Sequence, residues 1–439
     1  MDADTIFAVA SGAGHAAIAV MRISGKECRR VLAALCGQVP PARRMSLRRL
    51  GDLDQAMVVW LPGPGSYTGE DSAELYLHGG RAVLTGVADA LVALGARPAE
   101  PGEFTRRAFL NGRMDLTEAE AVHDLIAAET DAQRRQALRQ LDGALGELYR
   151  GWSDRLLVLL AEQEALIDFP DEDLPPEVEA RVQAELEALR GDVAAHLDDD
   201  RRGERLREGL VFAITGTPNV GKSSLINALA GRDVAIVSAT PGTTRDALET
   251  RVVLGGVPVT LVDTAGLRDA VDEIEAEGVR RARARAEAAD VVIVVAAVRA
   301  GTSCLPRNDV DAVAKPRHDD GGSNCIRIVN KIDLGGCVPP GTIGVSALTG
   351  EGLEALRARL AGTARALTES SGPPPLTQAR HRAALQEAAA RLAGAAIADL
   401  AELRAEDLRL ALRALGRITG SVGVEDILDT LFARFCIGK

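Results

Sequence analysis

The sequence predicts a multidomain protein with an α+β N-terminal domain, an α-helical bundle domain, and an α/β nucleotide-binding domain of the P-loop class inserted into that bundle. Three observations support this prediction. The length of 439 residues corresponds to about three domains of ~150 residues each. A phosphate-binding motif lies near the middle of the chain, between an apolar run and a helical run. Alanine- and leucine-rich segments with helical periodicity flank it on both sides.

The N-terminal part, residues 1–116, mixes short apolar runs with turns, which is typical of an α+β domain. Its apolar runs predict strands over 16–23, 56–61 and 72–77. Apolar residues at helical spacing predict a helix over 83–94.

Helical periodicity then dominates residues 117–208, the first part of the predicted helical domain. Thr117 and the two glutamates that follow resemble a helix start with a capping residue and early carboxylates. A serine-, glycine- and proline-rich linker opens the second part, residues 369–439, where helical periodicity returns. We expect the two helical parts to pack together, so that the nucleotide domain between them is an insertion.

The nucleotide domain, residues 209–368, contains five short motifs in a fixed order. The first, GTPNVGKS at 216–223, follows an apolar run and precedes a helical one, as a phosphate loop requires. Its glycines let backbone N–H groups surround the phosphates, Lys222 reaches the β and γ oxygens, and the Ser223 hydroxyl ligates Mg²⁺.

The later motifs supply metal and base recognition. In DTAG, Asp263 can hold Mg²⁺ through a water, and the Gly266 N–H can reach the γ-phosphate. In NKID, the Asp333 carboxylate accepts from the N1–H and 2-amino groups of guanine, which adenine cannot offer. The Lys331 stem packs on the purine, and the Ala347 N–H of the SAL motif can donate to the guanine O6. With TTRD completing the set, the order of these motifs predicts a protein that binds and hydrolyses GTP.

The predicted GTP-binding residues are Gly216, Asn219, Val220, Gly221, Lys222, Ser223, Ser224, Ser238, Ala239, Thr240, Pro241, Gly242, Thr243, Thr244, Asp263, Thr264, Ala265, Gly266, Asn330, Lys331, Asp333, Ser346, Ala347 and Leu348.

The residue after DTAG is Leu267, where Ras-like switches carry a water-orienting glutamine. Another group must therefore position the attacking water. The nearby carboxylates Asp269, Asp272, Glu273 and Glu275 are candidates, and a solvated charged face on the following helix is the alternative for each of them.

Composition excludes several other classes of protein. The net charge of −12 gives no general attraction to nucleic acid or anionic membrane, so any contact with RNA needs local patches or a partner. The six cysteines form no C-x-x-C pair and no ligand spacing with the six histidines, which argues against a disulfide framework or a zinc site. The sequence shows no signal peptide and no apolar run of ~20 residues, so we expect a soluble cytoplasmic protein without a membrane contact.

Over essentially its full length, the chain resembles the MnmE (TrmE) family of tRNA-modification GTPases. Outside the GTP motifs, the resemblance rests on MRISG at 21–25, SYTGED at 66–71, HGG at 78–80, PGEFT at 101–105, RAFLN at 107–111, IDFP at 167–170 and the terminal FCIGK.

The resemblance implies a homodimeric GTPase that works with tRNA and an FAD-containing flavoprotein, MnmG, in a heterotetramer or larger complex. Together they install an aminomethyl-type group at carbon 5 of the wobble uridine (position 34) of certain tRNAs. It also implies that the N-terminal domain forms the dimer and binds 5-formyltetrahydrofolate or a related tetrahydrofolate. By motif position, the folate contacts fall on Arg22, Glu74, Arg113 and Lys439. Residues 12–17 depart from the family, because alanines stand where it has glycines and an arginine.

For GTP hydrolysis, the resemblance implies dependence on K⁺ and on dimerisation of the nucleotide domains. Among the four carboxylates after DTAG it singles out Glu275 as the group that activates or orients water. Thr244 would add a second hydroxyl to the Mg²⁺ held by Ser223. The implied K⁺ ligands are the Asn219 side chain and the carbonyls of Ser238, Thr240 and Thr243.

Two segments stay open on the sequence alone. Cys436, in FCIGK, could be a thiol that reacts at the modification site or one that is merely buried or nearby. Residues 299–325 are polar and irregular and depart from the family, so we expect a loop there rather than a well-formed helix.

Two other kinds of GTPase share the nucleotide motifs. A ribosome-assembly GTPase should carry an RNA-binding domain with a basic surface, whereas this chain is acidic and ends in FCIGK. A membrane-remodelling GTPase should carry an apolar or polybasic anchor, and none is evident.

Overall fold

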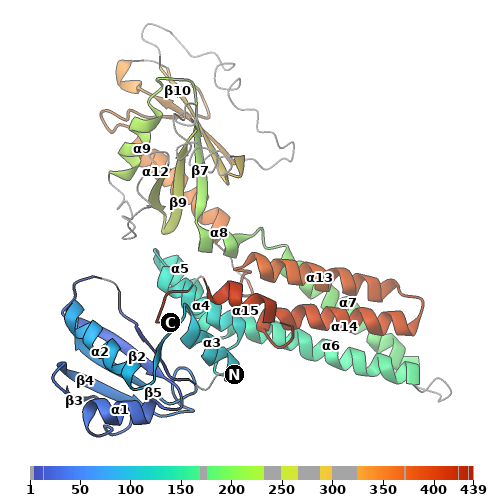
Figure 1. Ribbon diagram of the computed structural model, residues 1–439. Helices are drawn as coiled ribbons and strands as arrows, with labels where there is room; N and C mark the ends of the chain where they lie inside the picture. Colours follow the sequence, from blue (N-terminus) through green and yellow to red (C-terminus); the bar gives the residue numbers. More distant parts are fainter. Residues whose placement is uncertain are drawn as a thin grey trace, which may run out of the picture. The chain divides into compact units, whose positions relative to one another are not determined.

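The computed structural model describes residues 4–12, 14–168, 176–231, 249–264, 287–298, 324–335, 337–369, 372–423, 425–433 and 435–438. The chain forms two compact units (Figure 1). The first contains Met1–His123, Gln140–Gly191 and Ala383–Lys439; the second contains Asp124–Arg139 and Asp192–Arg382. Among the helices of the described part, none combines the length and apolar character that crossing a membrane requires.

The first unit begins with a six-stranded sheet in the order β3-β4-β5-β2-β1-β6, antiparallel except for the β1–β6 pair. Its strands are β1 (Ile6–Val9), β2 (Ile18–Ser24), β3 (Ser46–Leu50), β4 (Asp54–Leu61), β5 (Ser72–His78) and β6 (Arg97–Pro98). The helices of this part are α1 (Cys28–Cys36), α2 (Arg81–Ala93) and α3 (Glu103–Leu110).

One face of this sheet is covered and the other is more open. Alternate strand residues such as Met21, Val58 and Leu75 are buried in one core with Leu32 of α1 and Leu91 of α2. Because side chains alternate along a strand, the residues between them lie on the opposite face, which we call the open face. The three predicted strands and the predicted helix are confirmed, with ends shifted by no more than two residues.

The helical part of the first unit joins segments that are far apart in the sequence (Figure 1). Gln163 donates through Nε2 to the Ala401 carbonyl (3.3 Å), and Arg409 forms an ion pair with Glu164 (2.8 Å), so α6 packs against α14. The predicted packing of the two helical blocks is therefore confirmed. The helices of this part are α4 (Leu116–Ala127), α6 (Ala144–Asp168), α7 (Pro176–Leu197), α13 (Ala379–Ile397), α14 (Ala401–Thr419) and α15 (Glu425–Phe432), whereas α5 (Asp131–Leu141) belongs for most of its length to the second unit.

The predicted cap of α4 was wrong, because the helix begins at Leu116 and Asp115 caps it. Asp115 Oδ1 accepts hydrogen bonds from the Thr117 hydroxyl (2.7 Å) and the Glu118 N–H (2.9 Å). Glu118 in turn accepts from the Asp115 N–H at 2.6 Å. This reciprocal pair is a capping box with aspartate as its first residue, so Thr117 lies inside the helix.

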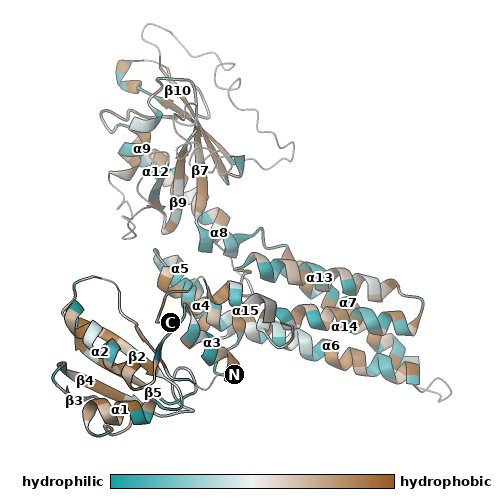
Figure 2. Cartoon of the chain, viewed as in Figure 1, coloured by the Kyte–Doolittle hydropathy of each residue, from teal (hydrophilic) through white to brown (hydrophobic). Residues whose placement is uncertain are grey.

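The second unit contains a six-stranded sheet in the order β12-β11-β10-β7-β9-β8, parallel except for the β8–β9 pair. Its strands are β7 (Leu210–Thr215), β8 (Glu249–Leu254), β9 (Val257–Asp263), β10 (Val291–Ala297), β11 (Asn324–Asn330) and β12 (Ile343–Gly344). Its other elements are α8 (Arg202–Glu208), α9 (Lys222–Ala230), the 3₁₀ turn η3 (Ile332–Leu334) and α12 (Leu353–Thr368). Figure 2 shows apolar residues gathered along its central strands, as expected for a parallel sheet buried on both faces.

This topology positions the nucleotide motifs. The phosphate loop follows β7, DTAG begins at the end of β9, NKID begins at the end of β11, and SAL follows β12. These four strands are parallel, so their carboxyl ends lie along one edge of the sheet, where α/β proteins bind ligands. Of the loop predicted over 299–325, Asn324 and Cys325 instead begin β11, and the remainder lies outside the described residues.

Candidate functional site

The phosphate loop connects β7 to α9 and surrounds a buried ammonium group. Lys222 is only 5% exposed, and its Nζ donates to the carbonyls of Gly216 and Thr217, each at 3.0 Å. Gly216 has a φ of 153°, and a Cβ there would lie 2.2 Å from the Val295 carbonyl oxygen. Glycine is therefore required where this loop passes β10.

Two oxygen groups suited to a hard cation face each other beside this loop. The Ser223 hydroxyl donates to Asp263 Oδ2 at 3.0 Å, across the gap between α9 and the end of β9. Thr264 fixes the backbone there, because its N–H and hydroxyl both donate to the Ile214 carbonyl (3.2 and 3.0 Å). Hydroxyl and carboxylate oxygens are ligands that Mg²⁺ prefers, so this pair fits the ion that the sequence predicted.

Asn330, which is buried at the end of β11, connects three predicted motifs. Its Nδ2 donates to the Val220 carbonyl at 2.9 Å, and its Oδ1 accepts from the Ala347 N–H at 3.1 Å. Gly221 has a φ of 91°, and a Cβ there would lie 2.5 Å from Asn330 Nδ2. The side chain thus holds the phosphate loop and the SAL motif together. The Ala347 N–H, predicted from the sequence to donate to guanine O6, donates to Asn330 Oδ1 in this structure.

Lys331 makes a second connection to the phosphate loop. Its Nζ donates to the Asn219 carbonyl at 2.7 Å. Both residues have left-handed backbone, with φ of 65° for Lys331 and 64° for Asn219. Asp333 lies in η3 and is exposed. A side chain that recognises guanine has to be accessible to the nucleotide, and the exposed position of Asp333 allows this contact.

The remaining predicted GTP-site residues divide into two groups. Ser346 is buried and its hydroxyl oxygen accepts from the Thr349 N–H (3.1 Å), whereas Ser224 and Leu348 are exposed. The second group lies outside the described residues and consists of Ser238, Ala239, Thr240, Pro241, Gly242, Thr243, Thr244, Ala265 and Gly266. Four further predictions also lie outside the described residues: Glu275, the three alternative carboxylates after DTAG (Asp269, Asp272 and Glu273), the K⁺ carbonyls already named, and Lys439 of the folate prediction.

A different polar pair lies on the open face of the sheet in the first unit. The β2–β5 register places Arg22 opposite Glu74. Arg22 donates to Glu74 Oε1 through Nε (3.1 Å) and Nη2 (2.9 Å), and the Tyr76 hydroxyl donates to Glu74 Oε2 (3.0 Å). Burial, followed by the bond to Glu74, raises the pKa of Tyr76, so its hydroxyl stays a donor at neutral pH.

Aromatic rings enclose the guanidinium of this pair. Arg22 lies over the rings of Tyr67 and Phe104, at 5.1 and 5.8 Å from their centroids. Its Nη1 is buried and has no hydrogen-bond partner among the described residues. An unpartnered buried donor is costly, so this atom fits a ligand that supplies an acceptor.

Two more predicted contacts lie in the same neighbourhood. Arg113 is exposed, and its stem packs at Gly69, where a Cβ would be 3.2 Å from the Arg113 Cγ; Gly69 belongs to the same segment as Tyr67. Near the C-terminus, Gly438 has a φ of 97°, and a Cβ there would lie 2.5 Å from the Val9 carbonyl oxygen. The C-terminal segment therefore reaches the end of β1, the strand that pairs with the strand of Arg22.

Cys436 lies in this C-terminal segment. Its side chain is exposed, and its carbonyl accepts from the Gly102 N–H at 3.4 Å. Phe435 anchors the segment, because its buried ring packs near the rings of His123 (5.1 Å) and Phe432 (5.2 Å).

Sequence reasoning missed the aromatic residues around Arg22. Tyr76 was within reach, because it lies two residues from Glu74 on a predicted strand and so shares its face. Tyr67 and Phe104 belong to the SYTGED and PGEFT motifs, but their approach to Arg22 depends on contacts between segments distant in sequence. Thr217, whose carbonyl accepts from Lys222, was also not among the predicted residues.

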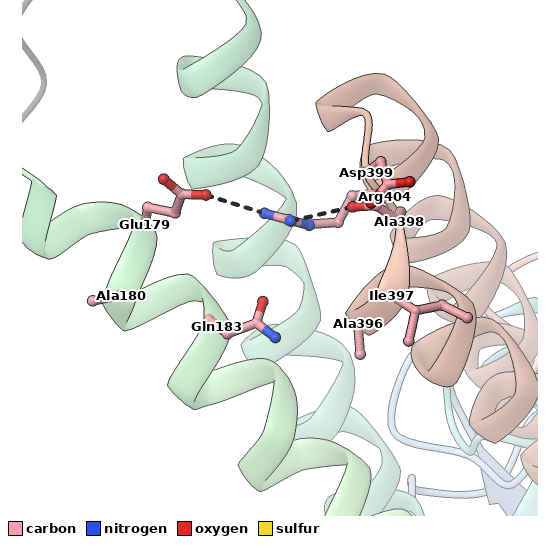
Figure 3. A pocket seen from close by; sticks show the side chains of 8 residues that line it. All are labelled: Glu179, Ala180, Gln183, Ala396, Ile397, Ala398, Asp399 and Arg404. Carbon is pink, nitrogen blue, oxygen red and sulfur yellow. Dashed lines mark hydrogen bonds and ion pairs between the residues drawn. The ribbon is translucent and has the colours of Figure 1, made fainter.

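A hollow of about 470 Å³ lies at the end of the helical bundle (Figure 3). Arg404 points across it toward Glu179 (4.0 Å) and donates to the Ala398 carbonyl (3.4 Å). None of the residues predicted from the sequence lines it. These contacts of Arg404 join α7 and α14, which is a role in packing the bundle.

Comparison with known proteins relates both units of the chain to one protein family. The family model described as the MnmE helical domain matches residues 116–436, and the one described as the GTP-binding protein TrmE N-terminus matches residues 5–113. The tRNA modification GTPase MnmE of Gluconacetobacter diazotrophicus is 61% identical over 99% of this chain and 98% of that protein. Its counterpart in Granulibacter bethesdensis is 57% identical over 100% of both chains. Among solved structures, the G domain of the T. maritima FeoB iron transporter is 26% identical over 35% of this chain and 98% of that chain, with a TM-score of 0.23.

Proposed function

The chain belongs to the MnmE family of tRNA modification GTPases, and from that membership we propose how it works. It is a GTP hydrolase that takes part in tRNA modification. In our proposal it depends on K⁺, acts as a homodimer with an FAD-containing flavoprotein partner, and uses a tetrahydrofolate one-carbon donor. The reaction modifies carbon 5 of the wobble uridine of certain tRNAs in the cytoplasm.

One observation above all supports the GTPase part: the side chain of Asn330 holds the phosphate loop and the SAL motif at the same edge of the sheet. Through its bonds to Val220 and Ala347, the groups that would bind the phosphates and those that would bind the base have a fixed separation. Lys331 adds a second tie at Asn219. A nucleotide that matches this separation can contact both ends without rearranging the loop.

For hydrolysis, the described residues supply the phosphate and metal contacts. The ammonium of Lys222, now on backbone carbonyls, would turn to the β and γ oxygens of GTP, whose negative charge it offsets. Ser223 and Asp263 would hold Mg²⁺, Ser223 directly and Asp263 through a water. That ion offsets charge on the phosphates when bound.

Water activation and K⁺ binding rest on the family resemblance and on one described residue. The left-handed backbone of Asn219, with a φ of 64°, lies in the phosphate loop next to the Lys331 contact. We propose that its side-chain oxygen ligates K⁺ together with carbonyls of Ser238, Thr240 and Thr243. Since Leu267 cannot orient water, we assign that role to Glu275.

The folate part of the proposal rests on the pair on the open face of the sheet. The Glu74 carboxylate can accept from the paired donors on the edge of a pterin, and the free Nη1 of Arg22 can donate to a carbonyl or carboxylate oxygen. Arg113 and Lys439 would supply cations for the glutamyl tail. When bound, the reduced folate supplies the one-carbon unit.

Reconstitution tests the complete proposal. The purified chain and its flavoprotein partner are incubated with GTP, K⁺, a reduced folate, an amine source and tRNA that lacks the modification. Nucleoside mass spectrometry should find a modified wobble uridine only in the complete mixture. Omission of GTP or the folate, or replacement of K⁺ by Na⁺, should each reduce the product. Full product without the folate would contradict the carbon donor, and full product without GTP would contradict the coupling.

A further inference from the structure

Four arginines lie on or next to the outermost strand of the sheet in the first unit. β3 is at the end of the strand order and pairs with β4 (Figure 1). Arg43 and Arg44 directly precede this strand, and Arg48 and Arg49 belong to it. We call these four residues the arginine edge.

The positive charge of the arginine edge is not compensated within the described chain. Between Glu27 and Asp52 the sequence has six arginines and no carboxylate, in a protein whose net charge is −12. The structure shows no ion pair between the edge and any carboxylate of the described residues. Where its guanidinium groups donate, they donate to backbone carbonyls: Arg43 to Gly65 (2.5 Å), Arg48 to Leu47 (2.9 Å) and Arg49 to Gly51 (2.9 Å).

Within the arginine edge, Arg49 lies on the open face that carries the Arg22–Glu74 pair, whereas Arg48 pairs with the buried Ala56 and lies on the covered side. Leu47, which is 55% exposed, shares a row of the sheet with Met57, Tyr76 and Val20. The neighbouring row on this face contains Glu74 and Arg22, because side chains two residues apart on a strand share a face. Three interstrand spacings, about 14 Å, separate β3 from β2.

We propose that the arginine edge binds the phosphate backbone of tRNA, with the open face leading from it to the Arg22–Glu74 pair. This inference rests on the proposed function, since it assigns the surface that the substrate tRNA contacts. Guanidinium groups match phosphate oxygens with paired donors, and they remain charged at all physiological pH values. Tyr76 and His78, on β5, add ring surfaces on which unpaired bases can stack.

The charge of the edge disfavours the other occupants of an outermost strand. If two copies of the chain paired through β3 around a two-fold axis, the arginine edges of both copies would face each other, and like charges repel. An acidic polypeptide could satisfy the charge. However, the phosphate backbone of tRNA carries one charge per nucleotide, which suits four cations that follow one strand and the residues before it, and the family acts on tRNA.

The test measures tRNA binding to the full-length chain as a function of salt. The probe is a fluorescently labelled transcript of a tRNA with uridine at the wobble position, titrated from 50 to 300 mM KCl. The variant R44Q/R49Q removes two exposed charges of the edge. The control R134Q/R135Q removes two exposed charges of α5 that are already paired with Asp131. Each phosphate contact contributes ~0.7–0.9 to the slope of log K against log salt, so the edge variant should bind ~10-fold more weakly near 0.15 M salt, with a slope shallower by ~1.4–1.8.

The possible results separate the alternatives. Weaker binding and a shallower slope in the edge variant alone, with unchanged GTP turnover and unchanged oligomeric state, support the proposal. Equal losses in both variants, or none in the edge variant, overturn it while the proposed function stands. A changed oligomeric state of the edge variant would assign the edge to a contact between copies of the chain. If polyglutamate displaced the labelled tRNA as effectively as unlabelled tRNA does, the edge would be assigned to an acidic protein. Either result overturns the proposal. If the wild type binds no tRNA, the surface and the direct tRNA contact of the proposed function are both contradicted.

Discussion

Asp333 and Asn330, three positions apart, divide the work of the NKID motif between the surface and the interior. Asn330 is buried and makes two hydrogen bonds within the protein, so its contribution is to the shape of the site. Asp333 is exposed in η3, where its carboxylate is available to a nucleotide. Substitutions at the two positions should therefore have different consequences.

Asp333→Asn should change base preference without disturbing the fold. An amide presents a donor where the carboxylate presents an acceptor, which matches xanthine better than guanine. Loss of a charge-assisted pair should lower GTP affinity by roughly 1.5–3 kcal/mol, or about 10- to 100-fold. Fluorescent GTP and XTP analogues measure both affinities. GTP binding equal to that of the wild type would show that Asp333 does not read the base.

Glu74→Gln tests the folate proposal at the residue that anchors Arg22. The substitution keeps the size of the side chain but removes the charge that would bind the pterin donors, so affinity for 5-formyltetrahydrofolate should fall about 10-fold or more. Calorimetry on the full chain measures it. Glu27→Gln is the matched control, because Glu27 is exposed and pairs with Arg30 on α1. Folate that binds both variants equally, or that does not bind the wild type, would remove the role of Glu74.

At the scale of elements, α8 is the short helix through which the chain enters β7, and polar contacts hold it closely. Arg382 donates to Glu204 Oε1 (2.7 Å), Asp199 Oδ1 (2.6 Å) and the Leu197 carbonyl (3.0 Å), and both carboxylate side chains are largely buried. Gln136 donates to the Gly203 carbonyl at 3.1 Å. Segments before and after the nucleotide-binding sheet are thus joined at one point.

Gly203→Ala should disrupt this joint. A Cβ at Gly203 would lie 2.2 Å from the Leu376 carbonyl oxygen and 2.8 Å from the Pro375 Cβ, and neither can move without the backbone. We expect a loss of about 1–3 kcal/mol in the stability of the second unit, the usual range for overpacking. Gly151→Ala on α6 is the control. Among the described residues outside its own helical turns, no atom lies within 4 Å of the added Cβ, so the variant should be neutral or gain up to ~1 kcal/mol from helix propensity. Urea unfolding measures both, and equal stability of the two variants would contradict the close packing of α8.

The elements also show what the sequence could predict and what it could not. The motifs at β7, β9 and β11 were predictable, because each combines an apolar strand with the loop chemistry that nucleotide binding needs. The strands β1, β3 and β6 were missed. β6 has only two residues, and β3 carries two adjacent arginines and an exposed leucine, so their strand character depends on pairing with distant partners. The rings around Arg22 were missed for the same reason, since Tyr67 and Phe104 meet it only after folding.

At the scale of the whole molecule, we propose that K⁺ and Glu275 complete the catalytic site. Glu275→Ala should leave GTP affinity nearly unchanged and lower turnover by ~10²–10⁴, the range for a missing general base or water-orienting group. Replacement of K⁺ by Na⁺ should also lower turnover, and Asn219→Ala should reproduce the sodium result in K⁺. Steady-state phosphate release measures all three. Equal rates in K⁺ and Na⁺ would refute the role of the ion, and an active Glu275→Ala protein would direct attention to Asp272 and Glu273.

The central claim is that GTP turnover in this chain is required for wobble-uridine modification, and Lys222→Ala tests it most directly. Lys222 supplies the buried ammonium of the phosphate loop, whereas the folate pair and the arginine edge belong to the other unit. Wobble nucleosides are measured by mass spectrometry in a strain that lacks the chain, complemented with the wild type or with Lys222→Ala at equal protein level. We expect modified uridine with the wild type and unmodified uridine with Lys222→Ala. Full modification with the variant would contradict the claim.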